Sequence, residues 1–340
     1  MKRTEIGEIG EFGLIEKLSE GLSPIQESTV LGIGDDAAVI NAGDKLMVVT
    51  TDMLLEGVHF DLSYCPLKHL GFKAIAVNIS DIAAMNAIPK QVTVSLGLSN
   101  RFSVEAVEEL YQGIQAAAQH YNFDVVGGDT TTSRSGLVIS ITAIGEVSKD
   151  LISYRSGAQK NDIVCVTGDL GGALVGLQVL ERDKQVFLSN PNMQPELGKY
   201  EYVVGRQLRP DARMDIIHEL RELQVRPTSM MDISDGLASE LFHICKSSDK
   251  GVAIYEDKLP IHKETYDTAL EFNLDPITCV LNGGEDYELL LTISQDDFQK
   301  LEKHADIHFI GYITDPKEGK LLVTKSGTTA GLKAQGWKHF

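Results

Sequence analysis

Acidic side chains that directly follow apolar, strand-like runs are the feature of this sequence that most constrains its fold. The first such run, residues 46–49, leads into Thr50, Thr51 and Asp52. This pattern is typical of a buried strand that ends at a site. Hydroxyl and carboxylate oxygens suit Mg²⁺, although the same residues at a strand end can simply cap the next turn. His59 follows seven residues after Asp52.

Four further segments place aspartate beside glycine or hydroxyl side chains. In chain order they contain Asp35 with Asp36, then Asp81, then Asp129 after two glycines, and finally Asp232 with Asp235. Most of these segments lie at predicted strand ends or loop edges, where α/β folds place their ligands. So many carboxylates exceed the needs of one Mg²⁺ ion and fit several ions that hold a polyphosphate.

Some of these aspartates also have ordinary structural explanations. Asp35 and Asp36 could form a solvated turn, and Asp235 could cap a helix that begins at Gly236. Asp81 stands among apolar residues, so it needs a cation or a partner if it is buried, or it faces water on the polar side of its helix. The residues alone leave these alternatives open.

Alternating strand-like and helix-like segments predict an α/β fold with two domains. In residues 1–150 we expect helices over 10–19, 66–85 and 103–121, and strands over 46–49, 91–98, 123–126 and 136–147. Residues 151–162 read as a loop and mark the boundary. In residues 151–340 we expect helices over 168–180, 210–223 and 261–270 and strands over 163–167 and 251–255. Residues 282–291 open with two glycines and should enter an apolar strand, and a strand, a helix and a strand should follow over 308–324. Residues 183–195 are expected to form a loop.

The composition excludes several classes of protein. The chain has 340 residues and a formal net charge of −18 without a Lys/Arg cluster, so we expect no nucleic-acid binding. It has no apolar run that fits a signal peptide or a membrane helix, which predicts a cytoplasmic protein without membrane contact. The four cysteines are far apart and should be reduced core thiols. No Walker A loop or Rossmann fingerprint is present, so a nucleotide site must be of another type.

Six motifs, in this order, resemble the thiamine-monophosphate kinase family: GIGDDAAVI, TTDMLLEGVHF, NISDIAAM, VVGGDTTTS, MDISDGL and NGGEDYELL. The resemblance extends from Glu11 to Phe340. That family belongs to the ATP-binding superfamily of aminoimidazole ribonucleotide synthetase. The resemblance implies a two-domain α/β fold with mixed sheets. Its N-terminal sheet would close a barrel with a second subunit, so a homodimer is expected, and a C-terminal α/β domain would carry an aromatic substrate-binding tail.

The same resemblance implies ATP-dependent phosphorylation of thiamine monophosphate to thiamine diphosphate. The transfer would be direct and in line, so no nucleophilic side chain is expected. Several Mg²⁺ ions would be held by Asp36, Thr50, Thr51, Asp52, Asp81, Asp129, Asp232 and Asp235. ATP would contact Tyr111, Gly128, Asp129, Arg155 and Ser234, and the thiamine substrate would contact His59, Glu285 and Trp337.

Sister enzymes and a non-catalytic acidic metal-binding protein are the alternatives. A selenophosphate synthetase would need a reactive cysteine or selenocysteine near the N-terminus, whereas the first cysteine here is Cys65. The related hydrogenase maturation enzyme uses a C-terminal cysteine, and this chain ends in His339 and Phe340. Aminoimidazole ribonucleotide synthetase is not expected to carry this combination of TTD, histidine and GGEDYEL. A simple metal-binding protein would not explain the paired glycines or the aromatic tail.

Overall fold

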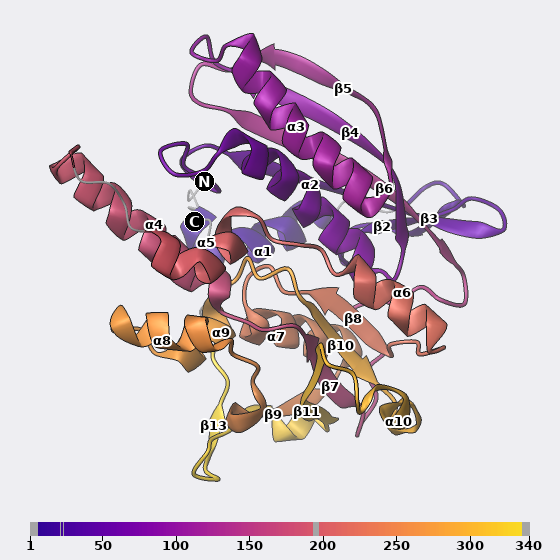
Figure 1. The fold of residues 1–340 in the computed structure, drawn as a ribbon. Coiled ribbons are helices and arrows are strands. Elements are labelled where there is room, and N and C mark those ends of the chain that lie inside the picture. Colours follow the sequence, from indigo (N-terminus) through magenta and orange to yellow (C-terminus); the bar gives the residue numbers. More distant parts are fainter. Residues whose placement is uncertain (1–5, 21, 23, 193–196, 335–340) are drawn as a thin grey trace, which may run out of the picture.

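Two β-sheets with helices packed on them make up the protein (Figure 1). The computed structural model describes residues 6–20, 22, 24–192 and 197–334. One sheet is formed by strands before residue 150 and the other by strands after residue 160. Both sheets contain parallel and antiparallel pairs, so the predicted α/β fold with mixed sheets is confirmed.

The first sheet has six strands in the order β1-β2-β3-β6-β4-β5. Its strands are β1 (Thr29–Leu31), β2 (Ala38–Asn41), β3 (Lys45–Leu55), β4 (Ile88–Leu98), β5 (Asp124–Thr132) and β6 (Val138–Ser148). Neighbouring strands are antiparallel, except that β5 runs parallel to β4 at the edge of the sheet. Strand β2 pairs with β3 only as far as Val49.

Helices α2 (Leu67–Ala84) and α3 (Val104–Tyr121) cover one face of this sheet (Figure 1). They cross closely because each carries a glycine at the contact. A Cβ atom on Gly71 would lie 2.0 Å from the Leu110 carbonyl oxygen, and one on Gly113 would lie 2.0 Å from that of Lys68. Helix α1 (Ile6–Ser19) precedes the sheet and contains a kink at Gly10.

The second sheet has seven strands in the order β13-β12-β9-β11-β7-β10-β8. Its strands are β7 (Ile163–Thr167), β8 (Ser229–Asp232), β9 (Gly251–Tyr255), β10 (Leu289–Ile293), β11 (Ile307–Thr314), β12 (Lys320–Val323) and β13 (Thr329–Gly331). The helices of this half are α4 (Gly172–Ser189), α5 (Glu201–Leu208), α6 (Met214–Glu222), α7 (Leu237–Ser248), α8 (Lys263–Glu271), α9 (Pro276–Asn282) and α10 (Phe298–Leu301).

Helix α2 joins the two halves. Apart from Asp81, every residue from Leu70 to Ala84 is buried. The helix packs against β3, β4 and β6 of the first sheet and also against β8 of the second. A helix that is apolar nearly all round is expected in such an enclosed position. The polar side chains within this buried stretch, which are those of Lys73, Asn78, Ser80 and Asp81, each have a hydrogen-bond or ion-pair partner.

Several predicted elements differ from the structure. Strand β3 does not end at Thr50 but continues to Leu55, because it pairs with β6 over its full length. Strand β5 likewise continues through the two glycines to Thr132, since its pairing with β4 persists beyond Val92 after a bulge. Helix α4 continues to Ser189, where a loop from residue 183 was predicted. That segment is polar because one face of the helix meets solvent and ion pairs.

Other predictions concern single residues. Ile15 and Leu18 of α1 are exposed, so these apolar side chains are not covered within this chain. All four cysteines are free and buried, as expected. Within the described residues, no helix combines the length and the apolar character that are needed to cross a membrane.

Candidate active site

A cavity of about 670 Å³ lies where the two halves of the chain meet. Helix α2 forms part of its wall with Lys73, Val77 and Asp81, which are four residues apart and so share one helical face. The predicted site residues that line this cavity are Asp36, Thr50, Thr51, Asp52, His59, Asp81, Arg155, Asp232, Ser234, Asp235 and Glu285. Residues predicted from six separate segments therefore meet at one place.

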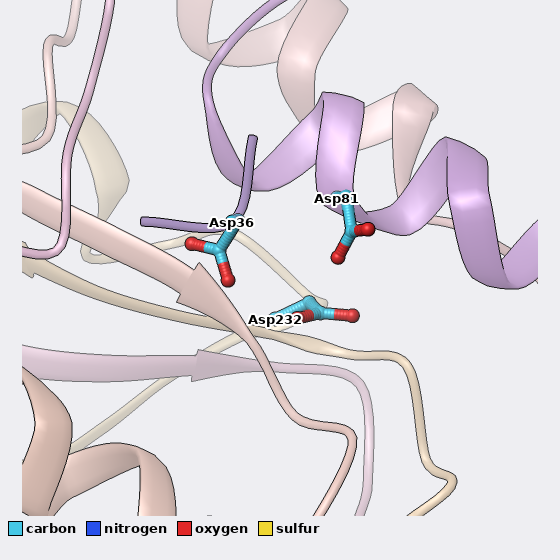
Figure 2. Close-up of side chains that lie close together, drawn as sticks. All are labelled: Asp36, Asp81 and Asp232. Atoms are coloured by element: carbon cyan, nitrogen blue, oxygen red, sulfur yellow. The ribbon is translucent and has the colours of Figure 1, made fainter. Parts of the chain in front are cut away.

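Three aspartates converge at one end of the cavity (Figure 2). Asp36 precedes β2, Asp81 belongs to α2, and Asp232 ends β8. Each offers a carboxylate oxygen, and these oxygens lie within 4.8 Å of one another. Asp36 and Asp232 are buried, with 7% and 2% of their surface exposed. We refer to these three residues as the acidic trio.

Neighbouring side chains hold each member of the acidic trio. Thr50 Oγ1 donates to Asp81 Oδ2 at 2.5 Å, and Ser80 Oγ donates to Asp232 Oδ2 at 2.7 Å. Asp36 Oδ1 accepts from Arg155 Nη2 at 2.6 Å and from its Nε at 3.2 Å. Asp36 Oδ2 is buried and has no hydrogen-bond partner among the described residues.

Burial dominates the electrostatics of this end of the cavity. It raises the pKa of Asp52 to about 6. The pKa of Asp232 rises to about 7, through burial first and then through the negative charge of Asp36. Burial and the neighbouring Asp52 and Asp232 charges raise the pKa of Asp81 well above its usual value. The pKa of Asp36 is also raised by burial, although Arg155 opposes that shift.

The acidic trio has the properties of a cation site. Each of the three carboxylates offers an oxygen close to the other two, one oxygen of Asp36 has no hydrogen-bond partner among the described residues, and the ionised carboxylates repel one another. Hard oxygen ligands of this kind suit Mg²⁺ rather than a softer metal. Thr50 and Asp52 lie two residues apart on one face of β3 and both line the cavity, where Thr50 donates to Asp81. These residues therefore fit the metal role that was predicted for them.

The turn after β8 supplies Ser234 and Asp235 to the cavity. Asp235 is not the cap of α7, because Gly236 occupies that position. Instead, the Asp235 backbone N–H donates to Glu240 Oε1 at 2.9 Å. Glu240 is buried, and its own pKa is raised well above the usual range, first by burial.

Glu285 stands at another part of the cavity wall, on a backbone turn of unusual conformation. Its φ is +56° and that of Tyr287 is +52°, both in the left-handed region. Backbone N–H groups of Glu285 and Tyr287 donate to Ser234 and Ile233 carbonyl oxygens, at 2.7 and 2.9 Å. This turn is thereby tied to the same segment that carries Asp232, so the two parts of the site are positioned together.

The other two acidic residues of this motif, Asp286 and Glu288, make buried hydrogen bonds and ion pairs behind the turn. Asp286 accepts from the backbone N–H of Gly171 at 2.8 Å, just before α4. Glu288 accepts from Arg206 Nη1 at 2.9 Å and from Arg213 Nη1 at 2.6 Å. Asp286 and Glu288 are therefore structural, while Glu285 between Gly284 and Asp286 faces the cavity.

His59 lies in the loop after β3 and lines the cavity. Its Nδ1 accepts a hydrogen bond from the Leu55 backbone N–H at 2.9 Å. A neutral imidazole that accepts at Nδ1 carries its proton on Nε2. Two pairs connect this loop to α4: Tyr64 Oη donates to Glu181 at 2.8 Å, and Lys184 Nζ lies 2.6 Å from Asp61.

Three predicted site residues do not line the cavity of this chain, and a fourth lies outside the described residues. Gly128 and Asp129 lie on β5, at the far edge of the first sheet from β3. Tyr111 lies on α3 and packs against the core. Trp337 is outside the described residues, so its predicted contact with substrate stays a prediction.

The structure also identifies cavity residues that the sequence did not reveal. Lys73 and Gln207 both line the cavity and both contact Glu285. Lys73 could have been found, because it stands eight residues before Asp81 on the same helical face of a strongly apolar segment. Gln207 had no such signal, since its helix was not predicted.

Two family models together match most of the chain. The model for the N-terminal domain of AIR synthase related proteins matches residues 34–147, and the one for their C-terminal domain matches residues 159–324. Among individual proteins, the thiamine-monophosphate kinase of Bacillus subtilis is 36% identical, over 97% of this chain and 99% of its own length. That of Aquifex aeolicus is also 36% identical, over 98% of this chain and 99% of its own.

Solved structures agree with these matches. The structure of AaThiL complexed with AMPPCP and TMP has a TM-score of 0.85 and 33% sequence identity, and the match covers 100% of both chains. Structures of the hydrogenase maturation protein HypE, at 16–19% identity, share the fold. Identity above 30% over nearly the full length, two matching domain models and the shared fold lead to one conclusion: this chain belongs to the thiamine-monophosphate kinase family.

Proposed function

We propose that the protein phosphorylates thiamine monophosphate to thiamine diphosphate, with ATP as the phosphoryl donor. The single observation that carries this proposal is the convergence of the acidic trio and Glu285 in one cavity. A cation site suits polyphosphate, and a separate carboxylate suits an organic acceptor. The relatives named above support the choice of substrates, because one of them was solved with AMPPCP, an ATP analogue, and TMP.

The acidic trio, together with Thr50 and Asp52, would hold Mg²⁺ at one end of the cavity. Bound Mg²⁺ would neutralise phosphate charge and align the donor and acceptor phosphates. We further propose that Thr51 and Asp235 belong to this set and that more than one ion binds. No side chain is needed as a nucleophile in a direct, in-line transfer. An oxygen of the acceptor phosphate would form a bond to the γ-phosphorus of ATP. At the same time the bond between the γ-phosphorus and the bridging oxygen would break, and ADP would leave.

Arg155 is well placed to hold the donor. Its Nε and Nη2 groups already donate to Asp36, which fixes the guanidinium beside the acidic trio. A guanidinium has five N–H groups, so three remain available for phosphate oxygens. Ser234 lines the same cavity two residues after Asp232. We propose that Arg155 and Ser234 contact ATP, and that His59, Glu285 and Trp337 contact thiamine monophosphate.

We propose that the protein works as a homodimer whose first sheets close into one barrel. All nine residues of β5 are exposed along the outer edge of the sheet. On the side of β3 that faces away from β6, no strand pairs with it beyond Val49 among the described residues. Asp129 is level with Met53, but three strand spacings, roughly 14 Å, separate them within one sheet. Pairing of β5 with β3 of a second copy would bring Asp129 and Gly128 beside the site.

The two halves of the chain contribute different residues to the site. We propose that residues 1–150 form an ATP- and Mg²⁺-binding domain and that residues 151–340 form a domain with an aromatic substrate-binding tail. The first half supplies Asp36, Asp81 and the β3 residues, and the second supplies Asp232 and Glu285. Neither half contains a complete acidic trio.

ADP release in the presence of Mg-ATP tests this function. We expect release to depend on thiamine monophosphate and to be lost in Asp52→Asn, because that carboxylate lines the proposed metal site. Equal ADP release with and without thiamine monophosphate would contradict the proposal. So would an Asp52→Asn variant that binds ATP and turns over like the wild type.

A further inference from the structure

Lys73 is a buried lysine in the middle of an apolar helix. Only 2% of its surface is exposed, and the flanking residues of α2 are buried. An ammonium group in such a position strongly destabilises a fold unless it is paired. Lys73 must therefore be explained by its partners.

Those partners form a closed set around Glu285. Lys73 Nζ lies 2.7 Å from Glu285 Oε1 and donates to the Gln207 carbonyl oxygen at 3.2 Å. Gln207 Nε2 donates to Glu285 Oε2 at 2.8 Å. Both carboxylate oxygens of Glu285 are thus held, while about a third of its side chain stays exposed toward the cavity, at 31%.

Helix α2 also fixes the distance between this carboxylate and the acidic trio. Lys73 and Asp81 lie on one face of the helix, eight residues apart, which corresponds to about 12 Å along its axis. Val77 lies between them and lines the same cavity. A substrate that spans the cavity along α2 has its phosphate at Asp81 and its other end at Lys73 and Glu285.

We propose that Lys73 is a positioning and specificity-determining residue that acts through Glu285. It neutralises and orients that carboxylate, so that Glu285 accepts a hydrogen bond from a neutral N–H group and does not serve as the counter-ion of a cation. The inference rests on the proposed function, in which Glu285 contacts thiamine monophosphate. It deepens that function by naming the part of the substrate that Glu285 recognises.

The charge balance decides which part that is. Thiamine monophosphate has a positively charged thiazolium ring and a neutral pyrimidine ring with an amino group. Because Lys73 already balances the charge of Glu285, the pair offers little net attraction to the thiazolium. A carboxylate oxygen with a free lone pair still accepts a hydrogen bond from the amino group. Glu285 therefore selects an amino-substituted heteroaromatic ring.

Kinetics of Lys73→Met test the positioning role. We expect the KM for thiamine monophosphate to rise about tenfold or more, with the KM for ATP within about twofold of the wild type. Lys263→Met is the matched control, since Lys263 forms an ion pair with Asp267 on the surface of α8. An unchanged KM for thiamine monophosphate, or equal rises for both substrates, would overturn the inference.

The double variant Lys73→Met/Glu285→Gln separates positioning from charge pairing and guards against misfolding. It leaves no unpaired buried charge, and the introduced amide can still accept the hydrogen bond. We expect its melting temperature to exceed that of Lys73→Met and its KM for thiamine monophosphate to fall below that of the single variant. If Glu285 were a counter-ion, Lys73→Met alone would bind substrate more tightly and the double variant would be the weakest.

An analogue of thiamine monophosphate with oxygen in place of the pyrimidine amino group completes the test. The wild type should use it at least about tenfold less efficiently, because its keto oxygen is an acceptor at the position where Glu285 needs a donor. Equal efficiency would refute recognition of the amino group. Failure of the wild type to use thiamine monophosphate at all would instead refute the proposed function.

Discussion

Asp232 combines an unfavourable electrostatic environment with a central place in the site. It is buried beside Asp36 and Asp81, and the negative charges repel one another. Asp232→Asn removes one of these charges while keeping an oxygen that can accept from Ser80. We expect the metal-free variant to be as stable as the wild type or more stable by about 1 kcal/mol, and its activity to fall about 100-fold or more.

Thermal unfolding in EDTA and in Mg²⁺ measures the stability part of this prediction, and ADP release measures the loss of activity. The wild type should gain stability from Mg²⁺, and Asp232→Asn should gain much less, because a metal ligand is missing. Asp267→Asn, at an exposed position on α8, is the control. A metal-free Asp232→Asn variant that is clearly less stable than the wild type would contradict the repulsion that we infer.

The raised pKa values give a sign to the pH dependence. Asp52 and Asp232 have pKa values of about 6 and about 7 in the folded chain, above their ordinary value of 3.8. At pH values between 3.8 and these raised pKa values, the two carboxyl groups keep their protons in the folded state and lose them in the unfolded state. The contribution of these groups to stability is therefore present at low pH and is lost as the pH rises from about 4 to about 7.

We consequently expect metal-free protein to melt at a lower temperature near pH 8 than near pH 5.5. Mg²⁺ should stabilise it most near pH 8, since carboxylates bind metal in their ionised form. Melting curves with and without Mg²⁺ at both pH values provide the measurement. Asp232→Asn should show a smaller pH effect, and an effect of the opposite sign in the wild type would contradict this account.

At the scale of elements, the close crossing of α2 and α3 makes a sharp prediction. A Cβ on Gly71 would meet the Leu110 carbonyl oxygen at 2.0 Å, so Gly71→Ala must force the helices apart. We expect a loss of about 2–3 kcal/mol in the free energy of unfolding. Gly205→Ala is the matched control, because nothing lies within 4 Å of its Cβ position on α5.

Urea unfolding of both glycine variants gives these values directly. Gly205→Ala should be neutral or slightly stabilising, by up to about 1 kcal/mol, because alanine favours a helix over glycine. If both variants lost the same stability, the loss would reflect a general intolerance of these helices to substitution. The crossing would then not be the cause.

The comparison of α2 and α4 shows which elements sequence could predict. Helix α2 was found within one or two residues, because its apolar periodicity is continuous. The second half of α4 was missed, since its polar residues meet solvent and the loop around Asp61, a partner far away in the chain. Strand β3 was cut short at Thr50 for a similar reason: Thr50 donates to Asp81 of α2, and Asn78 of α2 accepts from the Asp52 backbone N–H, contacts that local sequence does not reveal.

The site residues likewise divide into those that local sequence predicts and those that depend on tertiary packing. Asp36, Asp81 and Asp232 could be predicted, because carboxylates beside glycine, serine or apolar strands are unusual and recur in a known order. The pairing of Lys73 with Glu285 could not, because it joins residues more than 200 positions apart across two domains. Contacts of this kind depend on tertiary packing.

For the whole molecule, the position of Asp129 distinguishes a site within one chain from one shared by two. If β5 of one copy pairs with β3 of another, Asp52 and Asp129 of each site come from different copies. Asp52→Asn and Asp129→Asn would each be inactive alone. Mixed dimers of the two variants would contain one site with both aspartates intact.

Activity after unfolding and refolding a 1:1 mixture measures this arrangement. We expect recovery of about a quarter of wild-type activity, since about half of the dimers are mixed and each has one intact site. Each variant refolded alone is the control. No recovery from a mixture that forms dimers would place Asp52 and Asp129 of a site in the same chain and contradict the shared barrel.

The most direct test of the account is the stoichiometry of products from Mg-ATP and thiamine monophosphate. Chromatography of a single reaction should show ADP and thiamine diphosphate forming in equal amounts, with neither formed when thiamine monophosphate is omitted. ADP without thiamine diphosphate, or no reaction from a protein that binds both substrates, would contradict the central claim that the acidic trio and Glu285 form one phosphoryl-transfer site.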